Sequence, residues 1–277
     1  MELKTSKSKV VLKKGKEKAI KNRHHWIFSG AIKNMPEFEN GTILPVCSSD
    51  DEFLGYAYFN RHSSITGRML SFDNTPGSEA VRDNIKRSIS LRSKLFDANT
   101  NAYRLVNGEG DNLPGLVIDK YANLLVIQIA TLGMEKLKPF IIDTLIEELS
   151  PECIYEKSKL SSRKEEGMSP FEDIVYGKMN ESVEILENGI RFLVKLSGSQ
   201  KTGFYLDQRQ MRKLVMEFAE KKKILNCFSY TGAFTVYGLK GGALRVDSVD
   251  ESKEAIELAE RNVKLNGYDT ESNNFYV

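Results

Sequence analysis

The chain contains few cysteines and few histidines. Its 277 residues include three of each. Cys47, Cys153 and Cys227 are odd in number and have neither the spacing of a disulfide framework nor that of a CxxC metal clamp. His24 and His25 lack metal-ligand spacing to other histidines or cysteines. The sequence therefore predicts no metal site and favours the reducing cytoplasm.

Long apolar runs are also absent. The N-terminus, MELKTSKSKVVLKKGKEKAI, has no apolar stretch of signal-peptide length. No later run approaches the roughly 20 apolar residues that a membrane-spanning helix requires. Internal repeats and low-complexity tracts are missing as well. We therefore expect a soluble, intracellular protein.

Positive charge is concentrated at one end of the chain. The whole sequence has a net charge of +2, whereas residues 1–33 hold nine lysines and one arginine against Glu2 and Glu17, a net +8. Such a basic segment suits a polyanion such as RNA. A solvated, partly disordered tail explains the same charge run. His24 and His25 lie in this segment and are interpreted as packing residues or as residues at the edge of an RNA site.

The first two thirds of the chain divide into two patterns. A length of 277 residues accommodates about two domains, or three small ones. Short extended runs separated by Gly, Pro and Asn predict a β-rich module over residues 1–73, with a packed helical turn at 26–32. Residues 74–196 combine helical periodicity at 78–98 and 133–149 with runs typical of strands. We expect an α+β domain there.

A hairpin turn and a polar loop are predicted within this central region. The dipeptide Asn188-Gly189 predicts a two-residue hairpin turn, because both positions tolerate positive φ. The polar segment that contains Arg163 and Lys164 predicts a mobile loop. These two residues and Lys157 are candidates for RNA contact, although a mobile charged loop explains them equally well.

The C-terminal segment has the most informative pattern. Residues 221–267 read as strand, tight turn, helix, strand, acidic residue and helix. This order predicts a parallel, Rossmann-like β-to-α crossover. A helix that begins near Asp207, its candidate N-cap, precedes the crossover and has the apolar face Met211, Leu214, Val215, Phe218 and Ala219. A doubly wound sheet needs more strands than the remaining ten residues provide, so we expect an incomplete domain.

Asp250 ends the second strand of this segment, 18 residues after Gly232. A carboxylate at that place accepts hydrogen bonds from both hydroxyls of a ribose, or alternatively it caps the following helix. The turn after the first strand has a single glycine, Gly232, whereas a dinucleotide pyrophosphate generally needs the three glycines of GxGxxG. S-adenosylmethionine has a ribose but no phosphate. The turn therefore favours a methyl donor over NAD.

The segment GSQKTGFYLDQR, residues 198–209, precedes the helix. Its composition is compatible with a loop that folds over an adenosyl ligand or RNA, in which Lys201 and Arg209 bind a carboxylate or a phosphate. A plain connector between two elements explains the composition equally well. Cys227 ends an apolar strand, where a small buried thiol is commoner than a nucleophile. We therefore assign Cys227 no catalytic role.

Four segments together resemble the bacterial large-subunit ribosomal RNA cytosine-5 methyltransferase I family: RLVNGEGDNLPGLVIDKY, GSQKTGFYLDQR, NCFSYTGAF and VDSVDESKEAIELAERNVKLNG. The resemblance implies a mixed α/β protein in three parts. These are a β-rich PUA RNA-binding module (1–73), a central α+β domain (74–196) and the N-terminal part of a Rossmann-like parallel α/β methyltransferase domain (197–277). The implied cofactor is S-adenosyl-L-methionine, and the implied partner is ribosomal RNA.

The resemblance also implies the residues of the donor site. They are Lys201, Thr202, Gly203, Phe204, Asn226, Phe228, Ser229, Tyr230, Thr231, Gly232 and Asp250. In the implied reaction a cysteine thiolate adds to carbon 6 of an unstacked cytosine, which makes carbon 5 nucleophilic enough to take the methyl group.

The sequence departs from the family pattern at its end. Family members continue past NFYV with an acidic adenine contact, an Asp-Pro-Pro motif and the cysteine nucleophile, and none of these follows Val277. We therefore expect no catalytic residue here and little or no methyl transfer. The strand at 224–228 would become a sheet edge, which predicts homodimerisation, swapping or local disorder in 221–277.

Two other functions remain open. One is a non-catalytic RNA-binding protein that keeps the PUA module. The other is an NAD-dependent oxidoreductase, which the single-glycine turn disfavours.

Overall fold

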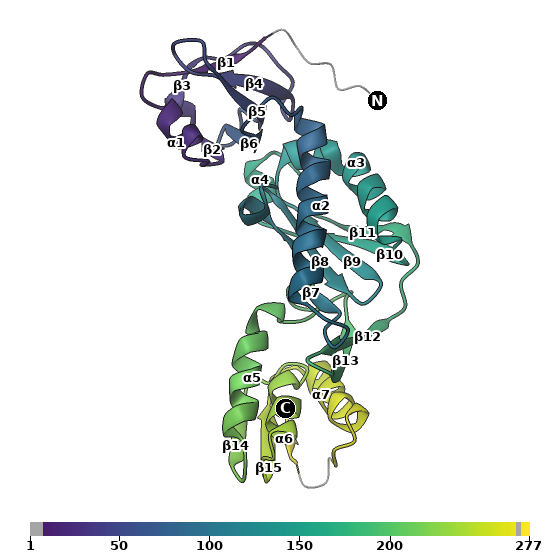
Figure 1. Ribbon diagram of the computed structural model, residues 1–277. Coiled ribbons are helices and arrows are strands. Elements are labelled where there is room, and N and C mark those ends of the chain that lie inside the picture. The colour runs from purple at the N-terminus through teal and green to yellow at the C-terminus, as the bar shows by residue number, and fades with distance from the viewer. Residues whose placement is uncertain (1–7, 270–272) are drawn as a thin grey trace. The chain divides into compact units, whose positions relative to one another are not determined.

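The computed structural model describes residues 8–269 and 273–277 (Figure 1). The chain forms two compact units. The first comprises residues up to 95 together with 104–119 and 123–178, and the second comprises 96–103, 120–122 and 179–277. No helix among the described residues is long and apolar enough to cross a membrane. The domain boundaries at 73 and 196 stay predictions.

The N-terminal part of the first unit is a six-stranded sheet. In spatial order its strands are β2 (Trp26–Ile27), β6 (Gly67–Ser71), β5 (Phe53–Phe59), β4 (Ile43–Cys47), β1 (Val10–Leu12) and β3 (Ile32–Asn34). The core comes from alternate strand positions such as Leu44 and Val46, because successive side chains of a strand point to opposite faces. This sheet confirms the β-rich module. The short helix α1 (Glu17–Lys21) lies between β1 and β2.

The helical turn expected at 26–32 is only partly present. Trp26 and Ile27 form β2, and a single 3₁₀ turn, η1, follows over Ser29–Ala31. Ile27 is buried, whereas Trp26 and Phe28 are exposed. The residues alternate as in a strand because Trp26 and Ile27 pair with β6.

The central part of the first unit is a sheet with helices. The elements are α2 (Gly77–Leu95), β7 (Ala102–Asn107), η2 (Gly108–Asp111), β8 (Leu116–Tyr121), β9 (Leu124–Ile129), α3 (Leu132–Leu149), β10 (Cys153–Ser158), α4 (Ser162–Glu165) and β11 (Phe171–Gly177). The strands lie in the order β11-β10-β9-β8-β7. Helices α2 and α3 contact each other, and α2 runs along the sheet (Figure 1). Both helices confirm the prediction made from the helical periodicity of residues 78–98 and 133–149.

The prediction of a mobile, RNA-contacting loop around Arg163 is wrong for that residue. Arg163 is buried, and its Nη1 donates to the Ile129 carbonyl at 2.8 Å and to Glu135 at 2.9 Å. Glu166 is also buried and accepts from Arg68 at 2.7 Å. These interactions bind the segment to the unit, because buried charges are stable only with partners.

The second unit contains a hairpin and a parallel α/β unit. The hairpin strands are β12 (Ser182–Glu187) and β13 (Ile190–Lys195), and its turn, Asn188-Gly189, has φ values of 52° and 74°, as predicted. The other elements are η3 (Leu206–Gln208), α5 (Arg209–Phe218), β14 (Lys223–Cys227), α6 (Ala233–Lys240), β15 (Arg245–Val249), α7 (Lys253–Leu265) and β16 (Phe275–Tyr276). Strands β14, β15 and β16 are parallel neighbours in that order.

Helix α5 differs from its prediction in two ways. Its N-cap is Gln208, and the carboxylate of Asp207 instead accepts from Lys201 at 2.8 Å. The expected apolar face is largely exposed, with Phe218 at 75%, whereas Arg212 is 1% exposed. The helix turns Arg212 inward because a buried carboxylate pairs with it there, and periodicity in the sequence does not register that partner.

Candidate functional site

The parallel pair β14 and β15 creates the candidate site. Their register places Cys227 opposite Val249, so both strands end at the same edge of the sheet. The loop 228–232 leaves β14 there, and Asp250 follows β15 directly. In parallel α/β sheets ligands bind at the carboxyl ends of the strands. The β-to-α crossover predicted from the sequence is therefore confirmed.

The loop after β14 has an unusual backbone. Phe228, Tyr230 and Gly232 have φ values of 56°, 47° and 74°, in the left-handed region. Two of these residues carry side chains, which makes the conformation costly. A Cβ on Gly232 would lie 2.7 Å from the Cβ of Ala259 on α7, so only glycine fits. The loop is thereby pressed against α7.

Hydrogen bonds hold the loop in place. The amide of Ser229 donates to the Val249 carbonyl at 2.9 Å. From α7, the side-chain amide of Asn262 donates to the Thr231 carbonyl at 2.9 Å. The backbone is thus fixed before any ligand arrives, which reduces the entropy lost on binding.

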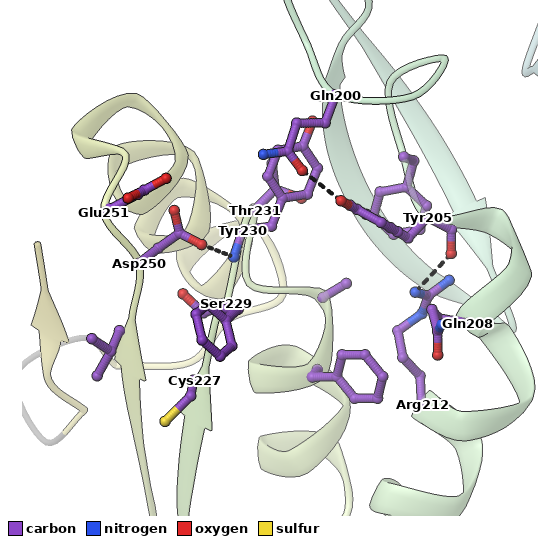
Figure 2. Close-up of a pocket in the computed structure, with 15 residues that line it drawn as sticks. Gln200, Tyr205, Gln208, Arg212, Cys227, Ser229, Tyr230, Thr231, Asp250 and Glu251 are labelled. Carbon is purple, nitrogen blue, oxygen red and sulfur yellow. Dashed lines mark hydrogen bonds between the residues drawn. The ribbon is translucent and has the colours of Figure 1, made fainter.

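Asp250 connects the two strand ends (Figure 2). One carboxylate oxygen accepts from the amide of Tyr230 at 2.8 Å, and the other accepts from the amide of Ser252 at 3.0 Å. The N-cap of α7 is Ser252, whose hydroxyl accepts from Ala255 at 3.2 Å. The capping role considered for Asp250 therefore belongs to Ser252. Each carboxylate oxygen of Asp250 keeps a second lone pair for a ligand.

A cavity of about 650 Å³ opens between these elements. It is lined by Gln200, Phe204, Tyr205, Gln208, Arg212, Cys227, Phe228, Ser229, Tyr230, Thr231, Ala233, Phe234, Val249, Asp250 and Glu251. Its size falls within the range of cofactor pockets, roughly 300 to 1,000 Å³.

Two lining hydroxyls lack partners. Ser229 Oγ and Thr231 Oγ1 are buried and make no hydrogen bond among the described residues. Buried polar atoms are normally hydrogen-bonded, so two unpaired hydroxyls in one cavity indicate a polar ligand. With the Asp250 carboxylate they supply donors and acceptors around a largely aromatic space.

Aromatic rings form another part of the wall. Tyr205 and Tyr230 meet edge to face, with ring centroids 5.4 Å apart. Burial raises the pKa of the Tyr230 phenol, which stays neutral and donates to the Gly203 carbonyl at 3.1 Å. This bond ties the loop after β14 to the segment before α5.

Arg212 supports the cavity from α5. Its Nε and Nη2 donate to the two carboxylate oxygens of Glu187, both at 2.7 Å, and its Nη1 donates to the Tyr205 carbonyl at 3.0 Å. Tyr237 also donates to Glu187, at 3.0 Å. The sequence analysis assigned no role to Arg212. The available signal was the pair of arginines, Arg209 and Arg212, one helical turn apart in the segment DQRQMR.

The structure brings six of the expected donor-site residues to the cavity: Phe204, Phe228, Ser229, Tyr230, Thr231 and Asp250. Five others do not line this described cavity: Lys201, Thr202, Gly203, Asn226 and Gly232. They hold its walls instead, as when Asn226 donates to Thr235 at 2.9 Å. Gln200, Gln208, Phe234 and Glu251 line it without having been expected.

Two side chains occupy unexpected environments. Cys227 was predicted to be buried, and this is wrong, because the thiol is exposed at the free edge of the short sheet and lines the cavity. Arg209, a candidate for a ligand carboxylate or phosphate, lies over the ring of Phe96 at 4.4 Å.

Two protein-family models match the chain. A PUA-like domain matches residues 10–72, and an S-adenosylmethionine-dependent methyltransferase matches residues 166–276. The second match confirms, at the level of the family, the cofactor class inferred from the single-glycine turn.

Full-length relatives extend the similarity. Ribosomal RNA large subunit methyltransferase I of Vibrio vulnificus is 39% identical over 267 residues, which cover 94% of this chain and 66% of the relative. The protein of the same name from Alteromonas mediterranea is 35% identical and is matched over 95% of this chain and 67% of its own length. The chain thus spans about two thirds of these relatives.

Solved structures agree with the sequence matches. A candidate SAM-dependent methyltransferase from Streptococcus mutans superposes with a TM-score of 0.80 at 27% identity, over 98% of this chain and 70% of that one. A candidate methyltransferase complexed with SAH gives a TM-score of 0.82 at the same identity and coverage.

Proposed function

Because the chain belongs to the ribosomal RNA large subunit methyltransferase I family, we propose that it binds S-adenosyl-L-methionine in the cavity at the ends of β14 and β15. The family reaction would use this donor to methylate large-subunit ribosomal RNA, and we assign no catalytic residue for it within the described part of this chain. The observation that carries the proposal is the pair of buried, unpartnered hydroxyls of Ser229 and Thr231 beside the Asp250 carboxylate.

The residues present fit this donor. Asp250 would hold the ribose hydroxyls with its remaining lone pairs, because its carboxylate is already oriented by Tyr230 and Ser252. The hydroxyls of Ser229 and Thr231 would bind polar groups of the donor, and the first turn of α6 favours an anionic group. S-adenosylmethionine supplies an electrophilic methyl group on its sulfonium.

The other expected donor-site residues have supporting roles in this proposal. Lys201, Thr202 and Gly203 shape the segment that carries Phe204 and Tyr205. Asn226 fixes the start of α6 through Thr235, and Gly232 permits the contact with α7. These residues would affect donor affinity through the shape of the cavity.

Calorimetry with S-adenosylhomocysteine and NAD tests donor binding. We expect the wild-type chain to bind S-adenosylhomocysteine and not NAD. Asp250→Ala should weaken binding about tenfold to hundredfold, because a hydrogen bond to a charged group contributes about 1.5 to 3 kcal/mol. Asp247→Asn, on β15 just before Asp250 but outside the described cavity lining, is the matched control. No binding by the wild-type chain would refute the proposal.

We propose carbon 5 of a cytosine as the methyl acceptor. The support is the resemblance of the chain's motifs to the cytosine-5 enzymes, and the target base would have to leave its stack to react. Nucleoside mass spectrometry of large-subunit RNA, from cells with and without the gene, tests this. Loss of a 5-methylcytidine is expected, and loss of a different methylated nucleoside would refute the position.

We also propose a homodimer through β14. This strand is at one end of the three-stranded order, and Leu225 on it is 65% exposed. Edge strands with exposed apolar residues tend to pair with another chain. Light scattering should give a dimer that Leu225→Glu converts to a monomer, whereas Leu91→Glu, at another exposed leucine, leaves the mass unchanged. A monomeric wild-type chain would contradict the proposal.

A further inference from the structure

Three aromatic rings line up beside β2. His24, Trp26 and Phe28 occupy alternate positions, as neighbours on one face of an extended chain do. The rings of His24 and Trp26 have centroids 5.9 Å apart, and those of Trp26 and Phe28 are 6.3 Å apart. Ile27, on the opposite face, is buried in the core. The fold therefore buries one face of this segment and leaves the aromatic row, His24, Trp26 and Phe28, at the surface.

The aromatic row borders a groove. Trp26 is 38% and Phe28 48% exposed, and the groove has a volume of about 500 Å³. Its lining includes the row itself, the apolar side chains of Leu12 and Ile20, and Lys16. A flat aromatic wall over an apolar floor suits a planar ring system better than a small polar ion.

The central ring of the row is held in position. Trp26 Nε1 donates to Glu109 at 2.8 Å, and the Trp26 amide donates to His24 Nδ1 at 3.2 Å. An indole fixed in this way loses little rotamer entropy when another ring stacks on it. The row is therefore preorganised.

Lysines gather at the groove: Lys16 lines it, and Lys13 Nζ donates at 2.9 Å to the carbonyl of Gly30, another lining residue. Lys13, Lys14, Lys16 and Lys18 are exposed, and within residues 8–269 and 273–277 no carboxylate forms an ion pair with them. Lys9 and Lys21 differ, since they pair with Asp51 and Glu52. Exposed lysines without a carboxylate partner beside aromatic rings are typical of nucleic-acid surfaces, whereas protein interfaces are depleted in lysine.

We propose that the aromatic row stacks unpaired bases of a single-stranded RNA segment, while the four lysines bind its phosphates. This inference rests on the proposed function in one respect, that the substrate is RNA. A duplex fits less well, because its bases are stacked inside the helix and present no ring face to the protein. Stacking on aromatic side chains is tolerant of sequence, so the row would capture a strand without selecting a base.

The only tryptophan of the chain reports on this site. The sequence contains a single Trp, so its fluorescence measures the environment of Trp26 alone. Titration with a ten-nucleotide oligouridine should quench the emission, and an RNA duplex of the same length should quench it far less. Equal quenching by both, or none by the single strand, would overturn the proposal.

Variants separate stacking from charge. Phe28→Ala should weaken oligouridine binding about tenfold, because base stacking on an aromatic side chain has effects of that order, while Phe171→Ala, another partly exposed phenylalanine, should not. Lys16→Glu should weaken binding and reduce its salt dependence, whereas Lys178→Glu should do neither. An unchanged affinity in Phe28→Ala would overturn the stacking.

Circular dichroism melting of the same variants shows whether the first unit, which holds the aromatic row, still folds, and calorimetry with S-adenosylhomocysteine shows whether the donor site in the second unit is intact. Retained donor binding together with lost RNA binding supports the inference. Retained donor binding in a wild-type chain that binds no RNA overturns the inference and leaves the donor site intact.

Discussion

The two candidate ligand surfaces, the donor cavity and the aromatic row, are built in opposite ways. The cavity contains buried hydroxyls and a loop with left-handed residues that hydrogen bonds hold in place. The aromatic row exposes rings on and beside the two-residue strand β2, and the lysines near it are exposed and have no carboxylate partner among the described residues. A small polar ligand is bound by groups that water cannot reach, whereas a long polyanion needs an open surface. The following variants should therefore affect one surface and leave the other unchanged.

The largest effect is expected at the buried ion pair below the donor cavity. Arg212→Met leaves Glu187 as an unpaired buried charge, which should lower the free energy of unfolding by about 3 to 5 kcal/mol. Urea denaturation measures this change. The double variant Arg212→Met, Glu187→Leu should recover most of the loss. A single variant as stable as the wild type would show that the pair contributes little.

A smaller effect is expected at the unpartnered hydroxyls. Thr231→Val removes one hydroxyl with little change of shape and should weaken S-adenosylhomocysteine about fivefold to tenfold, since a hydrogen bond contributes about 1 kcal/mol. The melting temperature of the free chain should stay the same or rise, because an unsatisfied buried group is lost. Oligouridine binding should not change. A lower melting temperature with unchanged donor affinity would assign the hydroxyl to structure.

At the aromatic row, the hydrogen bond from the Trp26 indole to Glu109 allows the effect of a fixed ring position to be separated from the effect of ring area. Trp26→Phe keeps a ring but loses the bond to Glu109, so we expect RNA affinity to fall about threefold, against about tenfold or more for Trp26→Ala. Anisotropy of a labelled oligouridine measures both. Donor affinity is the control and should remain constant. Equal losses in the two variants would show that the ring alone is not enough.

The smallest effect concerns a surface pair on β15. A hydrogen bond from Arg245 holds the pKa of the Asp247 carboxyl below its usual range. The pair therefore stabilises the folded chain above the unfolded pKa of about 3.9, and this contribution is lost as the pH falls through the lower folded pKa. Melting curves of Asp247→Asn and the wild type should differ slightly at pH 6 and converge near pH 3. A constant difference would exclude the linkage.

Much of the fold follows from local pattern. The order of strand and helix in residues 221–267 and the turn Asn188-Gly189 were predictable, because hydrophobic periodicity and turn chemistry act within a few residues. The place of Asp250 at the end of the second strand followed from the same pattern. Its hydrogen bonds to Tyr230 and Ser252 did not, because they depend on the loop conformation.

The errors concern side chains whose environment comes from distant residues. Arg163 was expected in a mobile charged loop and Arg212 was assigned no role, yet each is buried beside a carboxylate far along the chain. Cys227 looked like a buried thiol, but its strand has a neighbour in the described sheet on one side alone. The spacing of apolar residues indicates that one face of a helix or strand differs from the other. Tertiary contacts decide whether that face is buried or exposed to solvent.

The contact between Gly232 and Ala259 has a consequence for variation in this protein. The methyl group of Ala259 lies where any side chain at 232 would have to go. Position 259, which is not among the residues that line the described cavity, should therefore accept only glycine, alanine or serine. A bulkier residue on that turn of α7 would displace the loop 228–232 and so distort the cofactor pocket. Harmful substitutions are therefore expected at a helix position that does not itself line the pocket.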